Sequence, residues 1–130
     1  MYLLDTNIVI FSFRGNKKVN NRIKEVGFKN CFISEITIVE LYCGAEKSND
    51  KEYNINLLNE FSKKVTVIPI IEIIECYAFE RVKLEKSGYK LENFDLLIGA
   101  TAIANELILV TNNTKHLQRM SIKHIEDWTI

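Results

Sequence analysis

The stretch YLLDTN at residues 2–7 places a short apolar run directly before three polar residues. An apolar run that ends so abruptly is typical of a buried strand followed by a turn. We therefore predict a buried strand over residues 2–5, which ends at the polar residues Asp5, Thr6 and Asn7. Taken alone, Asp5 is explained equally well as the N-cap of a following helix.

Strand and helix patterns alternate along the rest of the chain. Apolar and β-branched runs predict further strands at residues 31–34, 65–70 and 107–111, with an edge strand at 122–126. The spacing of apolar residues predicts helices at residues 17–27, 34–46, 50–64, 71–87 and 93–105. This alternation predicts an α/β fold with a parallel sheet and helices on both faces, and 130 residues suffice for one domain over residues 1–130.

Two of the predicted helices differ from each other in their apolar pattern. Helix 71–87 has one apolar side, which consists of Ile71, Ile74, Ala78 and Val82. Helix 93–105 is apolar on more than one side, which predicts a buried helix, and Gly99 would permit close packing there.

Composition restricts the classes of protein. The 17 basic and 17 acidic residues balance, so a nucleic-acid partner would have to be bound by local groups or through a metal. Three distant cysteines without a CxxC pair argue against a disulfide scaffold and a zinc site. No apolar stretch reaches the roughly 18 residues of a membrane span, and we expect a cytoplasmic protein without a membrane partner.

Glu40 lies on a predicted helix, away from the apolar stripe that contains Ile38 and Leu41. Its neighbours one turn away, Ile36 and Cys43, are apolar, so this face does not resemble a freely solvated one. A half-buried carboxylate requires partners, and a metal ion is one solution. The alternative is an ordinary exposed glutamate.

Asp95 and a polar loop complete the set of candidates. Asp95 lies in the first turn of its helix, where the helix dipole favours a carboxylate with or without a function. The loop after the strand at 107–111 provides oxygens and amides that could orient a bound water or a phosphate, from Thr111, Asn112, Asn113 and Thr114. Because the carboxyl ends of parallel strands meet at one edge, Asp5, Asp95 and this loop should lie together.

The candidate ligands are oxygens without a histidine or cysteine companion, which suits Mg²⁺ or Mn²⁺ and not zinc. Such a centre lowers the pKa of a bound water and stabilises charge on a phosphodiester under attack. Phosphodiester cleavage without a metal would instead need acid–base side chains, and His116 and His124, the only two histidines, show no evident pairing.

Four blocks of sequence, in this order, resemble the PIN-domain family and specifically its VapC-type ribonuclease toxins of toxin–antitoxin systems. The blocks are LLDTN at 3–7, ISEITIVELYCG at 33–44, FDLLIGATAIA at 94–104 and LVTNNTKHL at 109–117. The resemblance covers nearly the whole chain.

The resemblance implies a three-layer α/β/α sandwich with a central parallel sheet of four to five short strands. It also implies Mg²⁺- or Mn²⁺-dependent endonucleolytic cleavage of a structured RNA such as a tRNA, a VapB-like antitoxin partner, and a homodimer or a larger toxin–antitoxin assembly. The family's acidic metal-binding and catalytic positions correspond to Asp5, Glu40 and Asp95. Supporting polar positions correspond to Thr6, Asn7, Ser34 and Thr37.

The sequence departs from the family pattern after the last core strand. Many relatives carry a further acid there, whereas this chain has Thr111, Asn112 and Asn113, and His116 stands where an acid is common. The fourth site residue is therefore Asn113, Asn112 or none, and the number of metal ions, one or two, stays open. A PIN-like domain that binds RNA or antitoxin without turnover is the main alternative to an enzyme. A receiver-like signalling domain fits less well, because no second acid follows the first strand.

Overall fold

Five parallel strands form the centre of the computed structural model, which describes residues 1–130. They lie in the order β3-β2-β1-β4-β5, and their bounds are β1 (Tyr2–Leu4), β2 (Cys31–Ser34), β3 (Thr66–Ile68), β4 (Ile108–Val110) and β5 (Ile125–Glu126). The parallel sheet predicted from the alternation of strands and helices is confirmed, with five strands.

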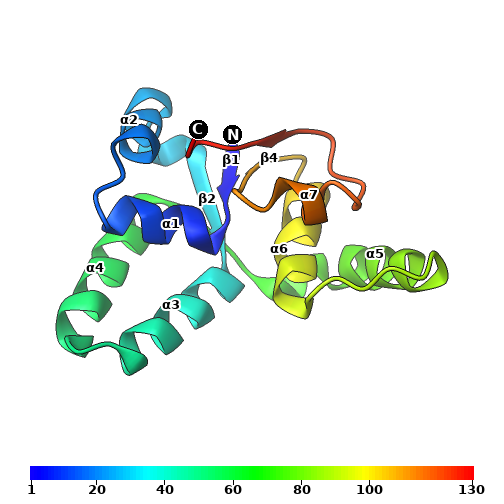
Figure 1. The fold of residues 1–130 in the computed structure, drawn as a ribbon, viewed down its shortest axis with the longest axis horizontal. Coiled ribbons are helices and arrows are strands. Elements are labelled where there is room, and N and C mark those ends of the chain that lie inside the picture. Colours follow the sequence, from blue (N-terminus) through cyan, green and yellow to red (C-terminus); the bar gives the residue numbers. More distant parts are fainter.

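Helices cover both faces of the sheet, as Figure 1 shows. One face carries α1 (Thr6–Phe13), α2 (Lys17–Val26) and α4 (Lys51–Lys64), and the other carries α5 (Ile74–Lys86), α6 (Asn93–Ala104) and α7 (Thr114–Leu117). Helix α3 (Glu35–Lys47) follows β2 and contributes to both sides, and two short 3₁₀ turns, η1 (Phe28–Asn30) and η2 (Ile70–Ile73), complete the elements. None of these helices combines the length and the apolar character needed to cross a membrane.

A hydrophobic core lies on each face of the sheet. Leu3 of β1 and Leu109 of β4 belong to one core, whereas Leu4 and Val110, the next residue of each strand, belong to the other. Successive side chains of a strand point to opposite faces, so a strand buried on both faces must be apolar at every position. This is why the central strands appear in the sequence as continuous apolar runs.

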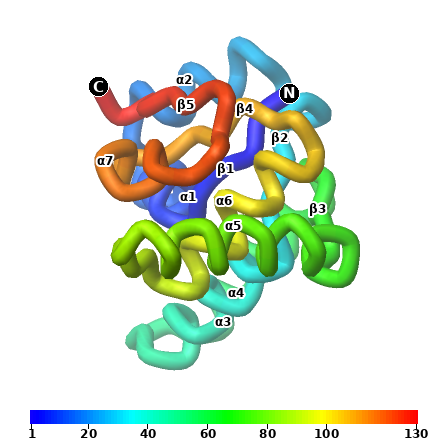
Figure 2. The backbone as a smooth tube through the Cα atoms, turned by 90° about the vertical axis from the view of Figure 1, so that its right-hand side faces the viewer, coloured from blue at the N-terminus to red at the C-terminus, as the bar shows by residue number.

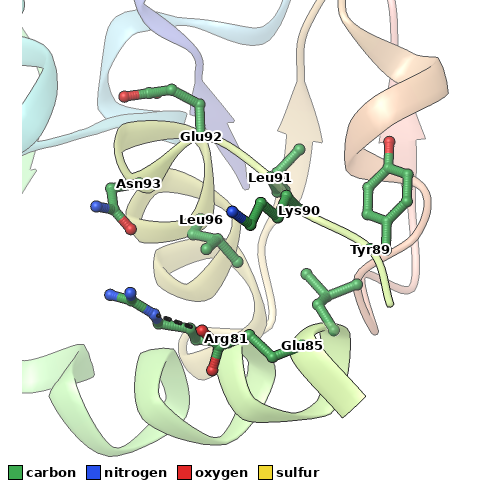
Figure 3. Close-up of a pocket in the computed structure, with 9 residues that line it drawn as sticks. Arg81, Glu85, Tyr89, Lys90, Leu91, Glu92, Asn93 and Leu96 are labelled. Carbon is green, nitrogen blue, oxygen red and sulfur yellow. Dashed lines mark ion pairs between the residues drawn. The ribbon is translucent and has the colours of Figure 1, made fainter. Parts of the chain in front are cut away.

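The direction of the chain through the sheet changes between β1 and β4. From β1 the chain proceeds to β2 and β3, and it then returns through α5 and α6 to β4 on the other side of β1. Figure 2 shows α5 lying across the outer side of α6 on this return path. Figure 3 shows Tyr89, Lys90, Leu91 and Glu92 of the segment that joins the two helices. In open parallel sheets a ligand crevice forms outside the carboxyl ends of the strands at such a switch point.

Helix α5 buries a side other than the apolar side of its sequence pattern. The predicted helix at 71–87 begins at Ile74, because residues up to Ile73 form η2. Ile71 and Ile74, from the apolar side of the pattern, are 74% and 50% exposed. The buried residues are Ile73 of η2 and Glu80 and Leu84 of α5, and Glu80 is only 1% exposed. Its carboxylate accepts a hydrogen bond of 2.9 Å from the backbone N–H of Ser121 and pairs with Lys83 at 3.4 Å. Glu80 can occupy a core-facing position because its carboxylate has hydrogen-bond and ion-pair partners. The spacing of apolar residues along the sequence therefore does not show which side of this helix is buried.

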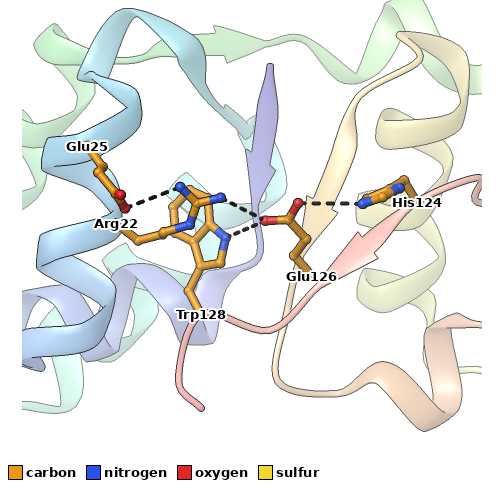
Figure 4. Close-up of polar contacts among 5 residues, drawn as sticks. All are labelled: Arg22, Glu25, His124, Glu126 and Trp128. Atoms are coloured by element: carbon orange, nitrogen blue, oxygen red, sulfur yellow. Dashed lines mark hydrogen bonds and ion pairs between the residues drawn. The ribbon is translucent and has the colours of Figure 1, made fainter.

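The C-terminal segment is attached to α2 by a set of polar and aromatic contacts (Figure 4). The guanidinium of Arg22 pairs with Glu25 at 3.3 Å and with Glu126 at 3.5 Å, and it lies 5.4 Å from the ring centre of Trp128. The indole N–H of Trp128 donates to Glu126 at 2.8 Å. These contacts hold β5 and the chain end against the first helical layer.

Helix α6 lies against the segment after α7 with no room for a side chain at Gly99. A Cβ atom at Gly99 would lie 2.3 Å from Sδ and 2.9 Å from Cε of Met120, and Met120 is itself buried. The close packing expected at Gly99 is therefore present, and it lets α6 approach the segment that follows α7.

We expect Gly99→Ala to gain less than the roughly 1 kcal/mol by which alanine favours a helix over glycine, because the flexible end of the Met120 side chain must move to make room. In a Met120→Ala background this contact is absent, and the same substitution should stabilise the protein more. Chemical denaturation of the two single variants and the double variant measures this coupling. Equal effects of Gly99→Ala in both backgrounds would contradict the packing argument.

Candidate active site

Asp5 stands at the centre of the switch point, directly after β1, and is only 5% exposed. Its Oδ1 accepts a hydrogen bond of 2.8 Å from the backbone N–H of Thr6, and its Oδ2 accepts one of 2.7 Å from the hydroxyl of Thr111. The backbone N–H of Asp5 donates to the carbonyl of Val110 at 2.9 Å, which continues the pairing of β1 with β4. Asp5 is thus the N-cap of α1, and both carboxylate oxygens are held in fixed positions.

Burial raises the pKa of Asp5, and the hydrogen bonds from Thr111 and Thr6 lower it again in part. A buried carboxylate is stable only when partners replace its lost hydration. Here the partners are neutral donors, and no cationic side chain forms an ion pair with Asp5. The negative charge is therefore oriented but not neutralised.

Glu40 is joined to this site by two threonine hydroxyls. The hydroxyl of Thr6 donates to Oε1 of Glu40 at 2.6 Å and lies 3.0 Å from the hydroxyl of Thr37. Because a hydroxyl has one hydrogen to donate and Thr6 uses it for Glu40, Thr37 must donate to Thr6. This relay from the fully buried Thr37 fixes the half-buried Glu40 beside the start of α1. Burial raises the pKa of Glu40, and the nearby charges of Asp5 and Glu92 raise it further.

Asp95 and Glu92 stand together at the start of α6. Glu92 is the N-cap, and its Oε2 accepts hydrogen bonds from the backbone N–H groups of Phe94 at 3.1 Å and Asp95 at 3.3 Å. Burial raises the pKa of Asp95 to about 6, with additional contributions from Asp5, Glu92 and Glu40 and an opposing one from His116. No donor in the protein forms a hydrogen bond to the Asp95 carboxylate, which makes it the least satisfied acid of the group.

The structure therefore brings Asp5, Glu40 and Asp95 within electrostatic range of one another, and it adds Glu92. We call these four residues the acidic cluster. Sequence reasoning missed Glu92 because the helix was expected to begin at residue 93. The available signal was an acid three residues before Asp95, at the N-cap of a buried helix, where a side-chain acceptor is favoured.

The residues of the polar loop after β4 differ in how they contact the acidic cluster. Thr111 accepts a hydrogen bond of 3.0 Å from the backbone N–H of Asn113 while it donates to Asp5. The amide oxygen of Asn113 binds Nδ1 of His116 at 2.6 Å, and no hydrogen bond joins Asn113 to a carboxylate of the acidic cluster. The side chain of Asn112 is exposed and makes no hydrogen bond.

Two of the other sequence candidates, Ser34 and Asn7, make no hydrogen bond to the acids with their side chains. The hydroxyl of Ser34 accepts from the backbone N–H of Ile36 at 3.0 Å and so caps α3. Asn7 is exposed, and its side chain makes no hydrogen bond within the protein. Of the supporting polar residues, only Thr6, Thr37 and Thr111 take part in the hydrogen-bonded network of the acids.

The donor set suits a hard divalent cation, because carboxylate and hydroxyl oxygens are the groups that Mg²⁺ and Mn²⁺ prefer. No three acidic, histidine or cysteine side chains lie close enough together to enclose one ion. Mg²⁺ is commonly bound through one or two carboxylates and keeps several waters, so it does not need a larger cage. The uncompensated charge of the acidic cluster is therefore compatible with one such ion.

Comparison with known proteins identifies the family of this chain and its fold. The family model described as PIN domain matches residues 2–123, so the chain belongs to the PIN-domain family. Its similarity is to the VapC group of that family, as the sequence blocks predicted. "Ribonuclease VapC2" of Haemophilus influenzae is 35% identical over 98% of this chain and 97% of the relative. "tRNA(fMet)-specific endonuclease VapC" of Shigella flexneri is 33% identical over 98% of both chains.

A solved structure confirms the three-layer α/β/α architecture. The crystal structure of VapBC2 from Rickettsia felis, bound to a DNA fragment from its promoter, contains a chain that matches with a TM-score of 0.88. The two chains are 32% identical, and the match covers 98% of each.

We expect Asp95→Asn to stabilise the metal-free protein at neutral pH. The folded-state pKa of Asp95, about 6, lies above its ordinary value of 3.8, so the folded state binds this proton more tightly than the unfolded state does. Ionised Asp95 therefore destabilises the fold in full above pH 6 and has no such effect below pH 3.8. Thermal unfolding in EDTA should show a higher melting temperature for the variant at neutral pH.

This difference should shrink as the pH falls from 6 towards 4. Glu60→Gln, on the exposed surface of α4, serves as the control for the loss of a carboxylate elsewhere. A variant that melts below the wild type at neutral pH would contradict the repulsion within the acidic cluster.

Proposed function

We propose that this chain is an endoribonuclease that hydrolyses phosphodiester bonds with the help of Mg²⁺ or Mn²⁺ bound at the acidic cluster, and that it is the toxin of a toxin–antitoxin pair. The observation that carries the proposal is a group of four carboxylates, at the switch point of the sheet, that no cationic side chain of the protein pairs with. The ribonuclease names of the relatives support the substrate class.

Asp5 and Asp95 would coordinate the ion, and Glu40 and Glu92 would lie beside it. Asp5 is preoriented by Thr6 and Thr111, and Asp95 has a carboxylate without any donor to satisfy it. An ion bound there supplies an activated water and stabilises negative charge on the phosphodiester.

Glu40 is the group we assign to accept a proton from the attacking water. The hydroxyl of Thr6 fixes its Oε1, whereas its Oε2 receives no hydrogen bond from the protein. The raised pKa of Glu40 makes it a better base than an ordinary surface glutamate, since a catalytic base works best with a pKa nearer the working pH.

Asn113 and His116 take the place of the further acid that many relatives carry. Because Asn113 binds His116, and His116 opposes the rise in the pKa of Asp95, we assign Asn113 a positioning role and His116 an electrostatic one. We assign no contact to Asn112.

We propose a VapB-like antitoxin as the protein partner and a structured RNA, such as a tRNA, as the substrate. The matching chain from Rickettsia felis comes from a VapBC complex, and the Shigella relative is named as a tRNA endonuclease. An antitoxin arginine would pair well with the unneutralised carboxylates, since guanidinium and carboxylate groups form strong bidentate hydrogen bonds. A homodimer, or a larger toxin–antitoxin assembly, follows from the same resemblance.

The alternative is a PIN domain that binds RNA or antitoxin without turnover. The loop after β4 favours it, because this loop provides an amide at Asn113 where many relatives provide an acid. An activity assay distinguishes the two proposals.

We expect the purified protein to cleave total cellular RNA in Mg²⁺ or Mn²⁺ and to be inactive in EDTA. Asp5→Asn should lower the rate by roughly two orders of magnitude or more, the loss typical of removing one group from a preorganised charged site. The products should carry 5′-phosphate and 3′-hydroxyl ends, because water and not the ribose hydroxyl attacks. Gel analysis of end-labelled RNA measures both.

Activity that survives EDTA, or 2′,3′-cyclic phosphate products, would contradict the metal-activated water. RNA binding without cleavage by the wild type would support the alternative.

We expect Glu92→Gln to lower the cleavage rate while the melting temperature stays close to that of the wild type. The glutamine oxygen can still cap α6 by accepting from Phe94 and Asp95, but the negative charge is lost from the acidic cluster. Glu60→Gln, far from the site on α4, is the matched control. Full activity of Glu92→Gln would show that Glu92 acts only as a helix cap.

A further inference from the structure

A pocket of about 380 Å³ opens beside the acidic cluster, between α5 and the segment that leads into α6 (Figure 3). Arg81 and Leu84 of α5 form one wall, and Tyr89, Lys90 and Glu92 form another. The volume falls within the range of ligand sites. Glu92 belongs both to this pocket and to the acidic cluster. An extended polymer bound at the cluster could therefore reach the pocket with its neighbouring unit.

Two cations are not neutralised by the protein: Lys90, which lines this pocket, and Arg119, which lies outside the lining against the ring of Tyr89. Lys90 is exposed and forms no ion pair, and Arg119 also forms none. Arg81, in contrast, is paired with Glu85 at 3.6 Å, so its charge is already compensated. Lys90 and Arg119 are therefore the groups available to an anionic ligand.

Tyr89, an aromatic residue of the pocket wall, packs against the guanidinium of the neighbouring Arg119. The guanidinium carbon of Arg119 lies 3.9 Å from the ring centre of Tyr89, so the two planar groups lie in contact. Unpaired bases of RNA stack on aromatic rings and on arginine planes, and each base stacked on an aromatic residue contributes about 1–3 kcal/mol. A free cation next to such a surface is the combination that binds a phosphate and its base.

The rim of the pocket is held in place before any ligand binds. The guanidinium of Arg81 donates to the hydroxyl of Tyr77 at 2.8 Å, and this hydroxyl donates to the amide oxygen of Asn93 at 3.2 Å. These bonds tie α5 to the first residue of α6. A preordered rim lowers the entropic cost of binding.

We propose that this pocket binds one nucleotide of a single-stranded part of the RNA, next to the phosphate at the acidic cluster. Tyr89 stacks with the base, and Lys90 and Arg119 bind the adjoining phosphates. This proposal rests on the proposed function. The acidic cluster repels phosphates and the net charge of the chain is zero, so nearby unpaired cations are required to retain the strand.

The test measures RNA binding by fluorescence anisotropy in EDTA, where cleavage is blocked. The probes are labelled bulk tRNA and a short single-stranded oligoribonucleotide of mixed sequence. Tyr89→Ala should weaken binding about tenfold, and Tyr89→Phe should restore it because the stacking ring is retained. Lys90→Gln should lower the slope of log affinity against log salt by about 0.7, the value for one phosphate contact on a single strand.

Lys24→Gln is the matched control, since Lys24 is an exposed and unpaired lysine on α2. Melting temperatures of all variants exclude unfolding as the cause of a loss. If the wild type cleaves RNA but Tyr89→Ala and Lys90→Gln bind RNA as Lys24→Gln does, the pocket proposal is overturned and the proposed function stands. If the wild type neither cleaves nor binds RNA, both are overturned.

Discussion

The pairing of β1 with β4 is the constraint on which the rest of the structure depends. It sets Leu4 beside Val110, so that Asp5 and Thr111 follow side by side at the carboxyl end of the sheet. The hydrogen bond of 2.7 Å between their side chains joins residues 106 positions apart in the sequence. A shift of the register by one residue would reverse the faces of both strands and separate the hydroxyl from the carboxylate. The same pairing therefore closes both cores and orients the central acid.

The acidic cluster shows a conflict between stability and function. Four carboxylates are gathered at one edge of the sheet. Burial raises the pKa values of three of them, and for Glu40 and Asp95 the charges of neighbouring acids such as Asp5 and Glu92 raise the pKa further. Neutral donors such as Thr6 and Thr111 orient the charges without cancelling them. Sites that bind cations or phosphoesters commonly store this kind of destabilisation, and the surrounding cores must compensate for it. Here the compensation comes from two hydrophobic cores, one on each face of the sheet.

Much of the fold could be predicted because strands and helices buried on several sides must be apolar throughout. The patterns at residues 2–5 and 31–34 and the helix at 93–105 correspond closely to β1, β2 and α6. The orientation of α5 could not be predicted, since the buried side includes Glu80, whose charge is satisfied by the backbone of Ser121 and by Lys83. A residue that the sequence would place in solvent is thus buried by partners that only the folded chain provides.

The sequence by itself determined the class of fold and the family blocks, and it singled out Asp5, Glu40 and Asp95 as candidate residues, because local periodicity and the ends of strands are properties of neighbouring residues. Only the tertiary structure decided which polar groups surround those acids. It added Glu92, joined Thr37 through Thr6 to Glu40, and turned Asn113 towards His116 and Ser34 towards its own helix. The physical reason is that hydrogen bonds and charge interactions depend on distances in space, which the order of residues along the chain does not contain.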